Sequence, residues 1–309
     1  MGYDLTKIKL DNWIELKKFS DSNKKYILRH PFQHKKEKYV KDIYEGKMNK
    51  KLDFNNLQTF NEKLNGYKVN KKYMKKVSKF ADKHDVRGYI KDKIGEEHLI
   101  KEYFCKDKIT KEDLMSLPNS FVLKTTLGSG TNLIIKDKSK FDLDEVCNYM
   151  NYLTTIDYGY IWGEFLYSYG KNKIIAEELL EEKGRIPDDL KCFCFQDDNG
   201  NKKKILYVER VIGEERERIH FDENWKEIKI DSLFKPLKEK IPKPKNLKKI
   251  VEIIDTLSED FNFVRVDLFV LNDKIYFGEL TFIPTAGYLI FKDEKVDYEW
   301  GSYIGSNKL

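Results

Sequence analysis

The sequence predicts an α/β protein of the α+β kind, in which amphipathic helices and β-hairpins follow one another along the chain. Apolar residues recur at three- and four-residue steps in residues 69–81 and 246–257, which is the period of a helix with one buried face. Strand-like runs occupy residues 189–195, 204–210 and 261–282, with polar turn residues between them. The 309 residues are enough for two or three subdomains with a sizeable core.

Composition limits the class of protein. Hydrophobic residues make up 40% of the chain and aromatic residues 14%, which indicates a folded protein of enzyme size. The chain contains no run of about 18 apolar residues and its first residues lack a signal-peptide pattern, so we expect a cytoplasmic protein without a transmembrane segment. The four cysteines lack zinc-ligand spacing and the five histidines are scattered, so reduced packing thiols are expected.

The net charge of +6 is concentrated near the N-terminus. Residues 1–51 hold 14 Lys and Arg against 7 Asp and Glu, whereas the rest of the chain is close to neutral. Such a region suits either an anionic partner, with peripheral association at a membrane surface as one case, or a solvated face without a partner. We expect no nucleic-acid partner, and no oligomeric state is predicted.

The first third of the chain is predicted to be mostly helical. Up to residue 64 the sequence is lysine-rich, and apolar positions are too sparse to define long elements, although residues 11–16 resemble a short helix start. Residues 69–81 predict an amphipathic helix. A second helix is expected to continue to about Lys93 and to end at Ile94-Gly95.

A glycine loop between two short strands is the next feature. Residues 121–124 predict a buried strand that ends in Lys124, and residues 133–135 predict the returning strand. This order is typical of a hairpin flap, in which Gly128 and Gly130 let backbone N–H groups approach an anion closely. Lys124 at the mouth of the loop would reach phosphates. An ordinary turn is the alternative, because a G-S-G triplet alone is weakly specific.

The following stretch combines a helix start with an acidic strand end. Asp142 and Glu145 form a capping-box-like start of a packing helix. Residues 173–180 predict an apolar strand that runs into Glu177, Glu178 and two leucines. The two acids either mark the solvated end of that strand or lie where the main chain would bind adenine and a carboxylate would approach the ribose.

Residues 261–282 predict a hairpin with its turn at Asn272-Asp273, and we place the chemistry of the protein there. Arg265 and Asp267 lie in one apolar arm and Glu279 in the other, and each unpaired buried charge would cost several kcal/mol. Two carboxylates on neighbouring strands beside a guanidinium suit a divalent cation, with the arginine facing an anion that the metal also touches. A structural Arg–Asp pair with one exposed glutamate is the alternative.

The pairing within this hairpin decides whether both carboxylates can serve one site. In a regular ladder, a two-residue turn at 272–273 would send the side chains of Asp267 and Glu279 to opposite faces of the sheet. A single site therefore requires an odd number of loop residues or a β-bulge. We expect a three-residue loop at 272–274, with Asp267 paired to Glu279 and a positive φ at Lys274.

In this order the motifs resemble the ATP-grasp superfamily and, within it, the TupA-like family of teichuronopeptide biosynthesis. The motifs are Asp82-Lys83, F-V-L-K ending at Lys124, G-S-G, E-E-L-L, D-L-K-C-F-C-F, R-V-D and G-E-L-T-F-x-P. The resemblance covers about residues 55–305, and its terminal block is the specific part. It implies an ATP-grasp fold with two α+β subdomains that grip ATP. The implied division is an N-terminal mostly helical region (1–115), a lid subdomain with the glycine flap (116–180) and a C-terminal subdomain with the metal site (181–309).

The resemblance also implies a role for individual residues. Lys124 would contact the ATP phosphates, and Arg265 would face the transferred phosphoryl group; these two are the implied catalytic residues. Asp267 and Glu279 would bind Mg²⁺, as one or two ions that Mn²⁺ could replace. The further nucleotide-binding positions would be Lys83, Gly128, Ser129, Gly130, Glu177, Glu178, Leu180, Asp189 and Lys191. Thr281 stands where many ATP-grasp ligases carry an asparagine, and a hydroxyl is a poorer metal ligand.

The activity that the resemblance implies is that of an ADP-forming ATP-grasp carboxylate–amine ligase. A substrate carboxylate would attack the γ-phosphoryl group of ATP, and an amine would then displace phosphate from the resulting acylphosphate to leave an amide. The TupA-like association implies a uronic-acid or amino-acid carboxylate, as a small molecule or linked to a glycan, in capsule or cell-surface polysaccharide synthesis. An ATP-dependent sugar kinase and a catalytically inactive binding protein with an anionic partner are the alternatives.

Overall fold

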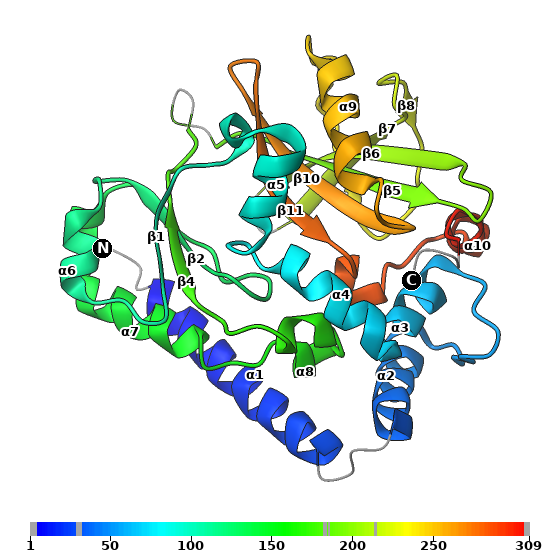
Figure 1. Cartoon of the computed structure of the whole chain (residues 1–309), viewed down its shortest axis with the longest axis horizontal. Coiled ribbons are helices and arrows are strands. Elements are labelled where there is room, and N and C mark those ends of the chain that lie inside the picture. The colour runs from blue at the N-terminus through cyan, green and yellow to red at the C-terminus, as the bar shows by residue number, and fades with distance from the viewer. Residues whose placement is uncertain (1–4, 29–32, 182–183, 185, 213–214, 306–309) are drawn as a thin grey trace. The chain divides into compact units, whose positions relative to one another are not determined.

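The chain folds as two compact units, which the computed structural model describes for residues 5–28, 33–181, 184, 186–212 and 215–305. Unit 1 comprises Met1–Tyr39, Lys75–Arg87 and Ile100–Leu180, and unit 2 comprises Val40–Met74, Gly88–Leu99 and Glu181–Leu309. Three helices contribute residues to both units: α2 (Gln33–Met48), α4 (Lys71–Ala81) and α5 (Val86–Ile94). Figure 1 shows the mixed α/β architecture. The three-part division expected from the sequence stays a prediction.

Unit 1 is built on a four-stranded antiparallel sheet in the order β1-β4-β2-β3. Its strands are β1 (Glu102–Lys106), β2 (Phe121–Thr125), β3 (Leu133–Ile135) and β4 (Ile174–Glu177). Its remaining helices are α1 (Leu5–Leu28), α6 (Lys111–Ser116), α7 (Leu143–Leu153) and α8 (Gly159–Trp162), with 3-10 turns at Lys138–Lys140 and Phe165–Ser168. The predicted hairpin of residues 121–135 is confirmed, because Phe121 pairs with Ile135 and Leu123 with Leu133.

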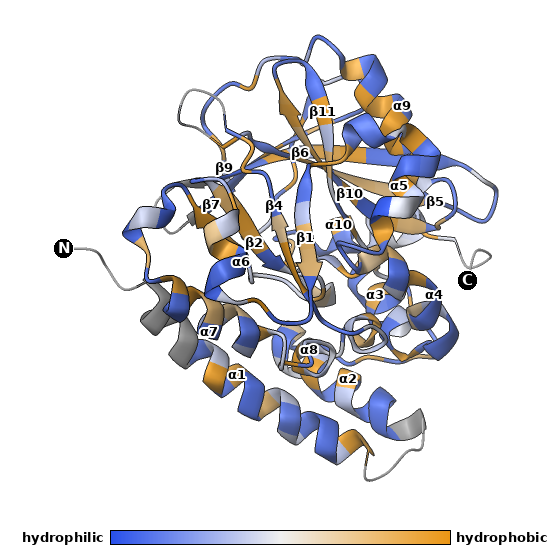
Figure 2. Ribbon diagram, turned by 60° about the vertical axis from the view of Figure 1, so that its left-hand side comes forward, coloured by the Kyte–Doolittle hydropathy of each residue, from blue (hydrophilic) through white to orange (hydrophobic). Residues whose placement is uncertain are grey.

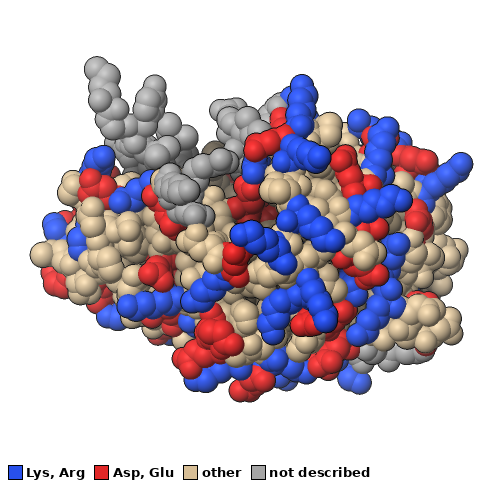
Figure 3. Space-filling model, turned by 90° about the horizontal axis from the view of Figure 1, so that it is seen from above, with Lys and Arg blue, Asp and Glu red and all other residues tan. Residues whose placement is uncertain are grey.

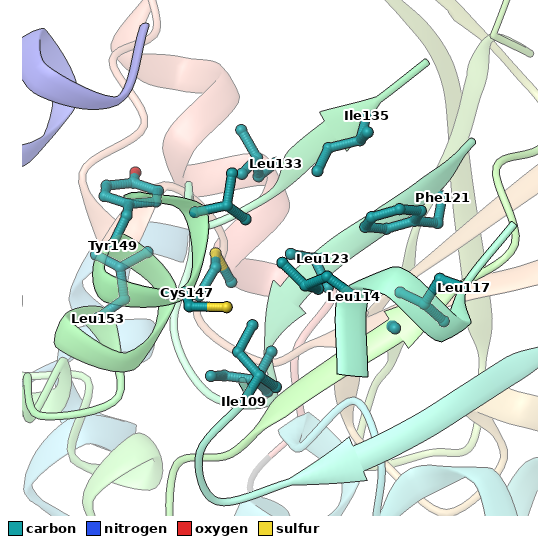
Figure 4. Close-up of a cluster of buried hydrophobic side chains, with 14 of the residues drawn as sticks. Ile109, Leu114, Leu117, Phe121, Leu123, Leu133, Ile135, Cys147, Tyr149 and Leu153 are labelled. Atoms are coloured by element: carbon teal, nitrogen blue, oxygen red, sulfur yellow. The ribbon is translucent and has the colours of Figure 1, made fainter. Parts of the chain in front are cut away.

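One face of the unit 1 sheet forms a hydrophobic core with α6 and α7 (Figure 4). Leu123 of β2 and Ala176 of β4 are fully buried in this core. Because side chains alternate between the faces of a strand, the next residues, Lys124 and Glu177, lie on the opposite face of the sheet. The pleat of two short strands thus brings a lysine and a glutamate together, although 53 positions separate them in the chain.

The N-terminal region is helical, as expected, but its helices are much longer than the predicted short start at residues 11–16. α1 has 24 residues and α2 has 16. Hydrophilic residues predominate along α1 (Figure 2), so no regular apolar stripe marks it in the sequence. Tertiary contacts hold it instead: Ser20 Oγ donates to the carbonyl of Asp157 at 2.6 Å, and Asn23 Nδ2 donates to that of Tyr160 at 2.9 Å.

Part of the basic excess at the N-terminus is neutralised locally. Lys17 pairs with Asp21, Lys18 with Glu15 and Lys24 with Asp157, at 2.6 to 2.8 Å. On the face shown in Figure 3, basic and acidic side chains are interspersed. Among the helices formed by the described residues, none combines the length and the apolar character that crossing a membrane requires.

Unit 2 contains a seven-stranded sheet in the order β11-β10-β5-β6-β7-β8, with β9 beside β7. All neighbours are antiparallel except β7 and β9. The strands are β5 (Asp189–Gln196), β6 (Lys202–Ile212), β7 (Glu215–Phe221), β8 (Glu227–Ile228), β9 (Lys235–Pro236), β10 (Phe263–Leu271) and β11 (Lys274–Thr281). The other elements are α3 (Phe60–Val69), α9 (Leu247–Ser258), α10 (Glu294–Ser302) and the 3-10 turns Glu96–His98 and Pro284–Gly287.

On one face of this sheet, apolar residues of α9 cover β10 and β5. On the opposite face, aromatic rings pack at one end only. The predicted stripe of α9, which includes Leu247, Ile250 and Leu257, is buried, and α9 packs on β10 and β5. At one end of the opposite face, the ring of Phe60 from α3 packs edge-on against Phe263 at 5.1 Å, together with other aromatic rings. Along β5 and β10, beyond these rings, that second face carries charged residues.

The hairpin of β10 and β11 departs from the prediction at its turn. Leu271 pairs with Lys274, so the loop holds two residues, and the positive φ values belong to Asn272 (51°) and Asp273 (60°). The expected three-residue loop and the positive φ at Lys274 are wrong. Asn and Asp tolerate the left-handed region, and a two-residue turn of this kind matches the twist of the strands.

A β-bulge restores the predicted pairing of the two carboxylates. The register shifts between Asp267 and Leu268: Leu268 pairs with Phe277, whereas Asp267 pairs with Glu279, which leaves Gly278 as the extra residue. A bulge places two residues of one strand opposite one residue of its partner. The side chains of Asp267 and Glu279 therefore leave the same face of the sheet, by the second of the two routes that the parity argument allowed.

Candidate functional site

Unit 2 carries a row of charged side chains across neighbouring strands. Asp267 on β10 pairs with Glu279 on β11 and with Lys191 on β5. Directly paired residues of antiparallel strands share a face, so these three side chains lie side by side. Arg265, two residues before Asp267 on the same strand, joins them on this face.

Arg265 connects the two carboxylates of this row. Its Nε donates to Asp267 Oδ1 and its Nη2 to Asp267 Oδ2, both at 2.7 Å. The same Nη2 donates to Glu279 Oε1 at 2.8 Å and to Thr281 Oγ1 at 2.9 Å, and the Thr281 hydroxyl donates to Glu279 Oε1 at 2.8 Å. Lys191 Nζ donates to Asp267 Oδ2 at 2.7 Å. One hydrogen-bonded network thus contains the predicted metal ligands and the predicted phosphoryl-facing arginine.

Burial and charge act against each other in this network. Burial disfavours the charged form of Lys191, but the charges of Asp267 and Asp189 outweigh it and raise the pKa of the lysine. The pKa of Arg265 is raised in the same way, because Asp267 and Glu279 outweigh the effect of burial. Burial raises the pKa of Asp189, although Lys191, 3.2 Å away, opposes this shift. Lys191 and Arg265 are therefore held as buried cations.

The oxygen atoms of this network fit a hard divalent cation. Asp267 and Glu279 offer carboxylates and Thr281 a hydroxyl, and the Glu279 side chain keeps 39% of its surface exposed. Mg²⁺ is usually held by one or two carboxylates, while substrate phosphates and water supply its other ligands. Within the described part of the chain, no three or more His, Cys, Asp or Glu residues gather as a complete metal site. The binding of a metal ion by Asp267 and Glu279 stays a prediction.

A second group of charges lies on the unit 1 sheet. Lys124 Nζ donates to Glu177 Oε2 at 2.6 Å, and the Arg87 guanidinium lies 3.5 Å from the other oxygen of Glu177. Arg87 also approaches Glu102 at 3.8 Å, and the ring of His84 lies 3.0 Å from the carboxylate of Glu102. Lys124, Glu177, Arg87 and Glu102 thus alternate in charge, and the ring of His84 contacts the last of them. Glu102 and His84 were not among the predicted site residues, because the sequence gives no sign that β1 lies beside β4.

The predicted adenine-binding segment begins where β4 ends. The Glu177 side chain is only 8% exposed and is directed to Lys124 and Arg87, as the distances above show. The N–H of Glu178 donates to the carbonyl of Lys101 at 2.9 Å, while Leu180 is 9% exposed. The hydrogen bond of Glu178 ties the segment to Lys101, the residue before β1. The binding of adenine by Glu177, Glu178 and Leu180 stays a prediction.

The glycine loop is fastened to the segment that follows α4. Lys83 Nζ donates to the carbonyl of Gly128 at 2.8 Å, and the Lys83 N–H donates to the carbonyl of Thr126 at 3.0 Å. Gly128 and Gly130 have φ values of 91° and 75°, which favour glycine over other residues. A Cβ at Gly128 would also meet the ring of Tyr158 at 2.8 Å. Lys83, predicted to contact the nucleotide, thus contacts the predicted flap.

Each unit brings together its own part of the predicted site. Unit 1 contains Lys83, Lys124, Gly128, Ser129, Gly130, Glu177, Glu178 and Leu180, and unit 2 contains Asp189, Lys191, Arg265, Asp267 and Glu279. Sequence reasoning missed Thr281 as a hydrogen-bond partner of Arg265 and treated it only as a departure from a metal-binding asparagine. Its place two residues after Glu279, on the same face of β11, was the available signal.

A model of the TupA-like ATP-grasp family matches residues 62–305 of the chain. A search among curated proteins found no match. The similar solved structures include D-alanine-D-alanine ligase from Helicobacter pylori, at 14% identity and a TM-score of 0.40, where 72% of this chain covers 60% of that one.

Two further structures are D-alanyl-alanine synthetase A from Vibrio cholerae and a RiPP-associated ATP-grasp ligase from Chryseobacterium gregarium. The first has 10% identity and a TM-score of 0.41, with 70% of this chain and 59% of that chain covered. The second has 12% identity and a TM-score of 0.34, with 74% and 60% covered. The chain thus spans about three fifths of the length of each of these three structures.

Proposed function

We propose, since the chain belongs to the TupA-like ATP-grasp family, that it is an ATP-dependent carboxylate–amine ligase that releases ADP. The proposed product is an amide between an amino acid or another amine and a uronic-acid-type carboxylate, either free or linked to a glycan. The proposed setting is the synthesis of capsule or other cell-surface polysaccharide.

The network around Arg265 is the single observation that carries this proposal. Asp267 and Glu279 present carboxylate oxygens on one face, and one guanidinium touches both. A structural Arg–Asp pair alone does not require the bulge that turns Glu279 to this side. Two carboxylates beside a buried arginine suit a reaction in which a metal-bound phosphoryl group is transferred.

Each charged group has a proposed task in that reaction. Asp267 and Glu279 would hold Mg²⁺, which when bound would neutralise charge on the phosphates of ATP. Arg265 would stabilise the negative charge of the phosphoryl group in the transition state, and Lys124 would bind the phosphates of ATP. Asp189 and Lys191, 3.2 Å apart, would lie near the ribose and the phosphates.

The remaining parts of the predicted site would position ATP. The backbone N–H groups of Gly128, Ser129 and Gly130 would close over the phosphates, with Lys83 fastening the loop through Gly128. The main chain from Glu177 to Leu180 would bind adenine. Positioning and charge neutralisation then contribute most of the rate, because phosphoryl transfer needs little covalent help from the protein.

The reaction would proceed in two steps that this arrangement supports. The substrate carboxylate attacks the γ-phosphoryl group, and ADP leaves as the acylphosphate forms. The amine then attacks the acyl carbon, phosphate leaves, and the amine gives up a proton as the amide forms. The buried cations Lys191 and Arg265 would offset the negative charge that accumulates in both steps.

The test is ADP release from ATP and Mg²⁺ with a panel of uronic acids and amino acids, each alone and in pairs. A ligase releases ADP in quantity only when a carboxylate and an amine are both present. ADP release with a sugar alone and a phosphorylated sugar as product would establish the kinase alternative. Failure of the folded protein to bind ATP at all would leave the inactive binding protein.

A further inference from the structure

The face that carries Asp267 continues onto β6 and β7, where a second charged group lies. Asp189 on β5 pairs with Glu209 on β6, and Glu209 pairs with Arg218 on β7. Because directly paired residues share a face, Arg218 and Glu209 lie on the same side of the sheet as the network around Arg265. Neither residue has a task in the reaction described so far.

The guanidinium of Arg218 is fixed in place from three sides. Its Nε donates to Glu209 Oε2 at 2.6 Å. Its Cζ lies 3.3 Å from the ring centroid of Phe234 and 4.9 Å from that of Tyr207, so two aromatic rings contact it. Burial raises the pKa of Glu209, but the charges of Arg218 and Lys191 outweigh it and the net pKa is lowered. The pair is therefore ionised, and its geometry is rigid.

Two polar groups at this place have no partner among the described residues. The terminal nitrogens of Arg218 donate no hydrogen bond there, although an arginine offers five N–H donors and only Nε is used. The hydroxyl of Tyr207 is fully buried and likewise has no hydrogen-bond partner in the described part of the chain. Burial raises the pKa of this hydroxyl, an effect that the charges of Arg265, Arg218 and Lys191 oppose and that of Asp267 reinforces. Lys191 and Arg265 already have carboxylate partners, so the donors left for a bound anion are the terminal nitrogens of Arg218 and the Tyr207 hydroxyl.

Arg218 and Tyr207 lie close enough to the proposed phosphoryl site to hold a group that reacts there. Tyr207 pairs directly with Lys191, which pairs with Asp267. Strands lie about 4.8 Å apart, so the guanidinium stacked over Tyr207 is roughly 10 Å from β10. A carboxylate held there would lie on the face that carries Arg265, and the lone pairs that the guanidinium leaves unused on its oxygens would be available to attack a phosphoryl group.

We propose that Arg218, fixed by Glu209 and assisted by the Tyr207 hydroxyl, binds the carboxylate of the substrate that is to be phosphorylated; the inference rests on the proposed ligase function. The planar fork of a guanidinium matches the two oxygens of a carboxylate, which a lysine cannot reproduce. Arg218 is thereby a residue that determines specificity, and Tyr207 is its partner on the same anion.

Formation of the acylphosphate can be measured even though the natural amine is unknown. Hydroxylamine serves as the amine, glucuronate and galacturonate serve as the carboxylates, and ADP and hydroxamate are measured with ATP and Mg²⁺. Arg218→Lys is expected to raise the KM for the uronate by about 10- to 150-fold, with the KM for ATP within twofold of wild type. Tyr207→Phe is expected to raise the KM for the uronate by a smaller factor, about 3- to 10-fold, without lowering Tm, because its hydroxyl has no hydrogen-bond partner among the described residues.

Arg210→Lys is the matched control. Arg210 lies on β6, pairs with Asp188 at 2.6 Å and, as a neighbour of Glu209, points to the opposite face of the sheet. It tests the loss of an arginine ion pair on β6, the strand that also carries Glu209, and its KM for the uronate is expected to stay at the wild-type value.

The outcomes separate the inference from the proposed function. If wild type binds ATP but forms no ADP and no hydroxamate with either uronate, the proposed function fails, and the inference falls with it. If wild type is active while Arg218→Lys and Tyr207→Phe keep the wild-type KM for the uronate, the inference alone is overturned. Equal effects of Arg218→Lys and Arg210→Lys would also overturn it, since a structural loss would then explain both.

Discussion

Asp267 and Glu279 are directly paired across β10 and β11, although a regular ladder beyond the two-residue turn would place Asp267 opposite Gly278. The bulge at Gly278 turns Glu279 to the face of Asp267, where Arg265 binds both carboxylates. A bulge costs regular ladder hydrogen bonds, so its presence here indicates that the shared face has a use.

The side chains of Asp267 and Glu279 differ in burial, so removing their charges should destabilise the protein to different extents. The Asp267 side chain is 5% exposed, and Asp267→Asn would leave Arg265 and Lys191 without their shared counter-charge, at a cost of about 3–5 kcal/mol. Glu279 is 39% exposed, and Glu279→Gln should cost less than about 1 kcal/mol. Urea unfolding measures both values.

The same variants test the metal assignment. ADP release is titrated with MgCl₂, and Glu279→Gln is expected to require a higher Mg²⁺ concentration while it remains folded, because one charged oxygen ligand is lost. A wild-type Mg²⁺ requirement in Glu279→Gln would exclude Glu279 as a ligand and leave Asp267 in a purely structural ion pair.

Gly278→Ala should disturb the bulge. A Cβ at this position would lie 3.0 Å from the carbonyl oxygen of Asp267 and 3.2 Å from the ring of Phe269, so the backbone that carries Asp267 must shift. We expect a lower Tm together with slower ADP release. Gly46→Ala is the control, because its added methyl meets nothing within 4 Å and replaces glycine inside a helix. Unchanged Tm and turnover in Gly278→Ala would show that the bulge tolerates a side chain.

Lys124→Ala should weaken the binding of ATP. The loss of a charge-assisted contact to phosphate costs about 1.5–3 kcal/mol, which is roughly 10- to 150-fold in the dissociation constant. Titration calorimetry with ATP and Mg²⁺ provides the measurement. Lys106→Ala removes an exposed lysine of β1, on the same sheet, which pairs with Asp113 of α6, and it should leave ATP affinity unchanged. Wild-type affinity in a folded Lys124→Ala variant would remove Lys124 from the site.

The loop of Gly128, Ser129 and Gly130 should become protected when nucleotide binds. Few of its atoms bury apolar surface, and Lys83 Nζ fastens it through one hydrogen bond to the carbonyl of Gly128. Hydrogen exchange of the loop amides is expected to slow on addition of a non-hydrolysable ATP analogue with Mg²⁺. Lys83→Met should speed exchange in the free protein. Equal exchange with and without the analogue would contradict the flap.

His220 should make unit 2 less stable in mild acid. Burial, and secondarily the charge of Arg218, lowers its pKa to about 4, whereas an unfolded chain has the ordinary value of about 6.5. The unfolded state therefore binds more protons between these values, and stability falls as the pH is lowered through this window. From pH 7 to pH 5 the expected loss is about 2 kcal/mol.

Urea unfolding of wild type and His220→Gln at pH 7 and pH 5 measures this loss. The wild type should lose about 2 kcal/mol more than the variant between the two values, because the glutamine does not titrate. An equal loss in both proteins would mean that another group is responsible.

The sequence by itself determined the elements whose pattern is local. The apolar stripes of α4 and α9 and the alternation along β5 and β6 follow from periods of 3.6 and 2 residues, and each element lies close to its prediction. It also singled out Arg265, Asp267 and Glu279, because a charge within an apolar strand needs a partner. These conclusions depend on residues a few positions apart.

Only the tertiary structure decided how distant segments meet. α1 carries no regular apolar stripe and is held by hydrogen bonds to residues more than a hundred positions away. The same holds for the pair of Lys124 with Glu177 and for the stacking of Arg218 between Phe234 and Tyr207. The bulge at Gly278 belongs here as well, since a two-residue turn and a three-residue loop suit the same sequence pattern. The register is selected by the need to bury one face of the sheet and to pair the charges on it. That face is buried only once the strands have assembled.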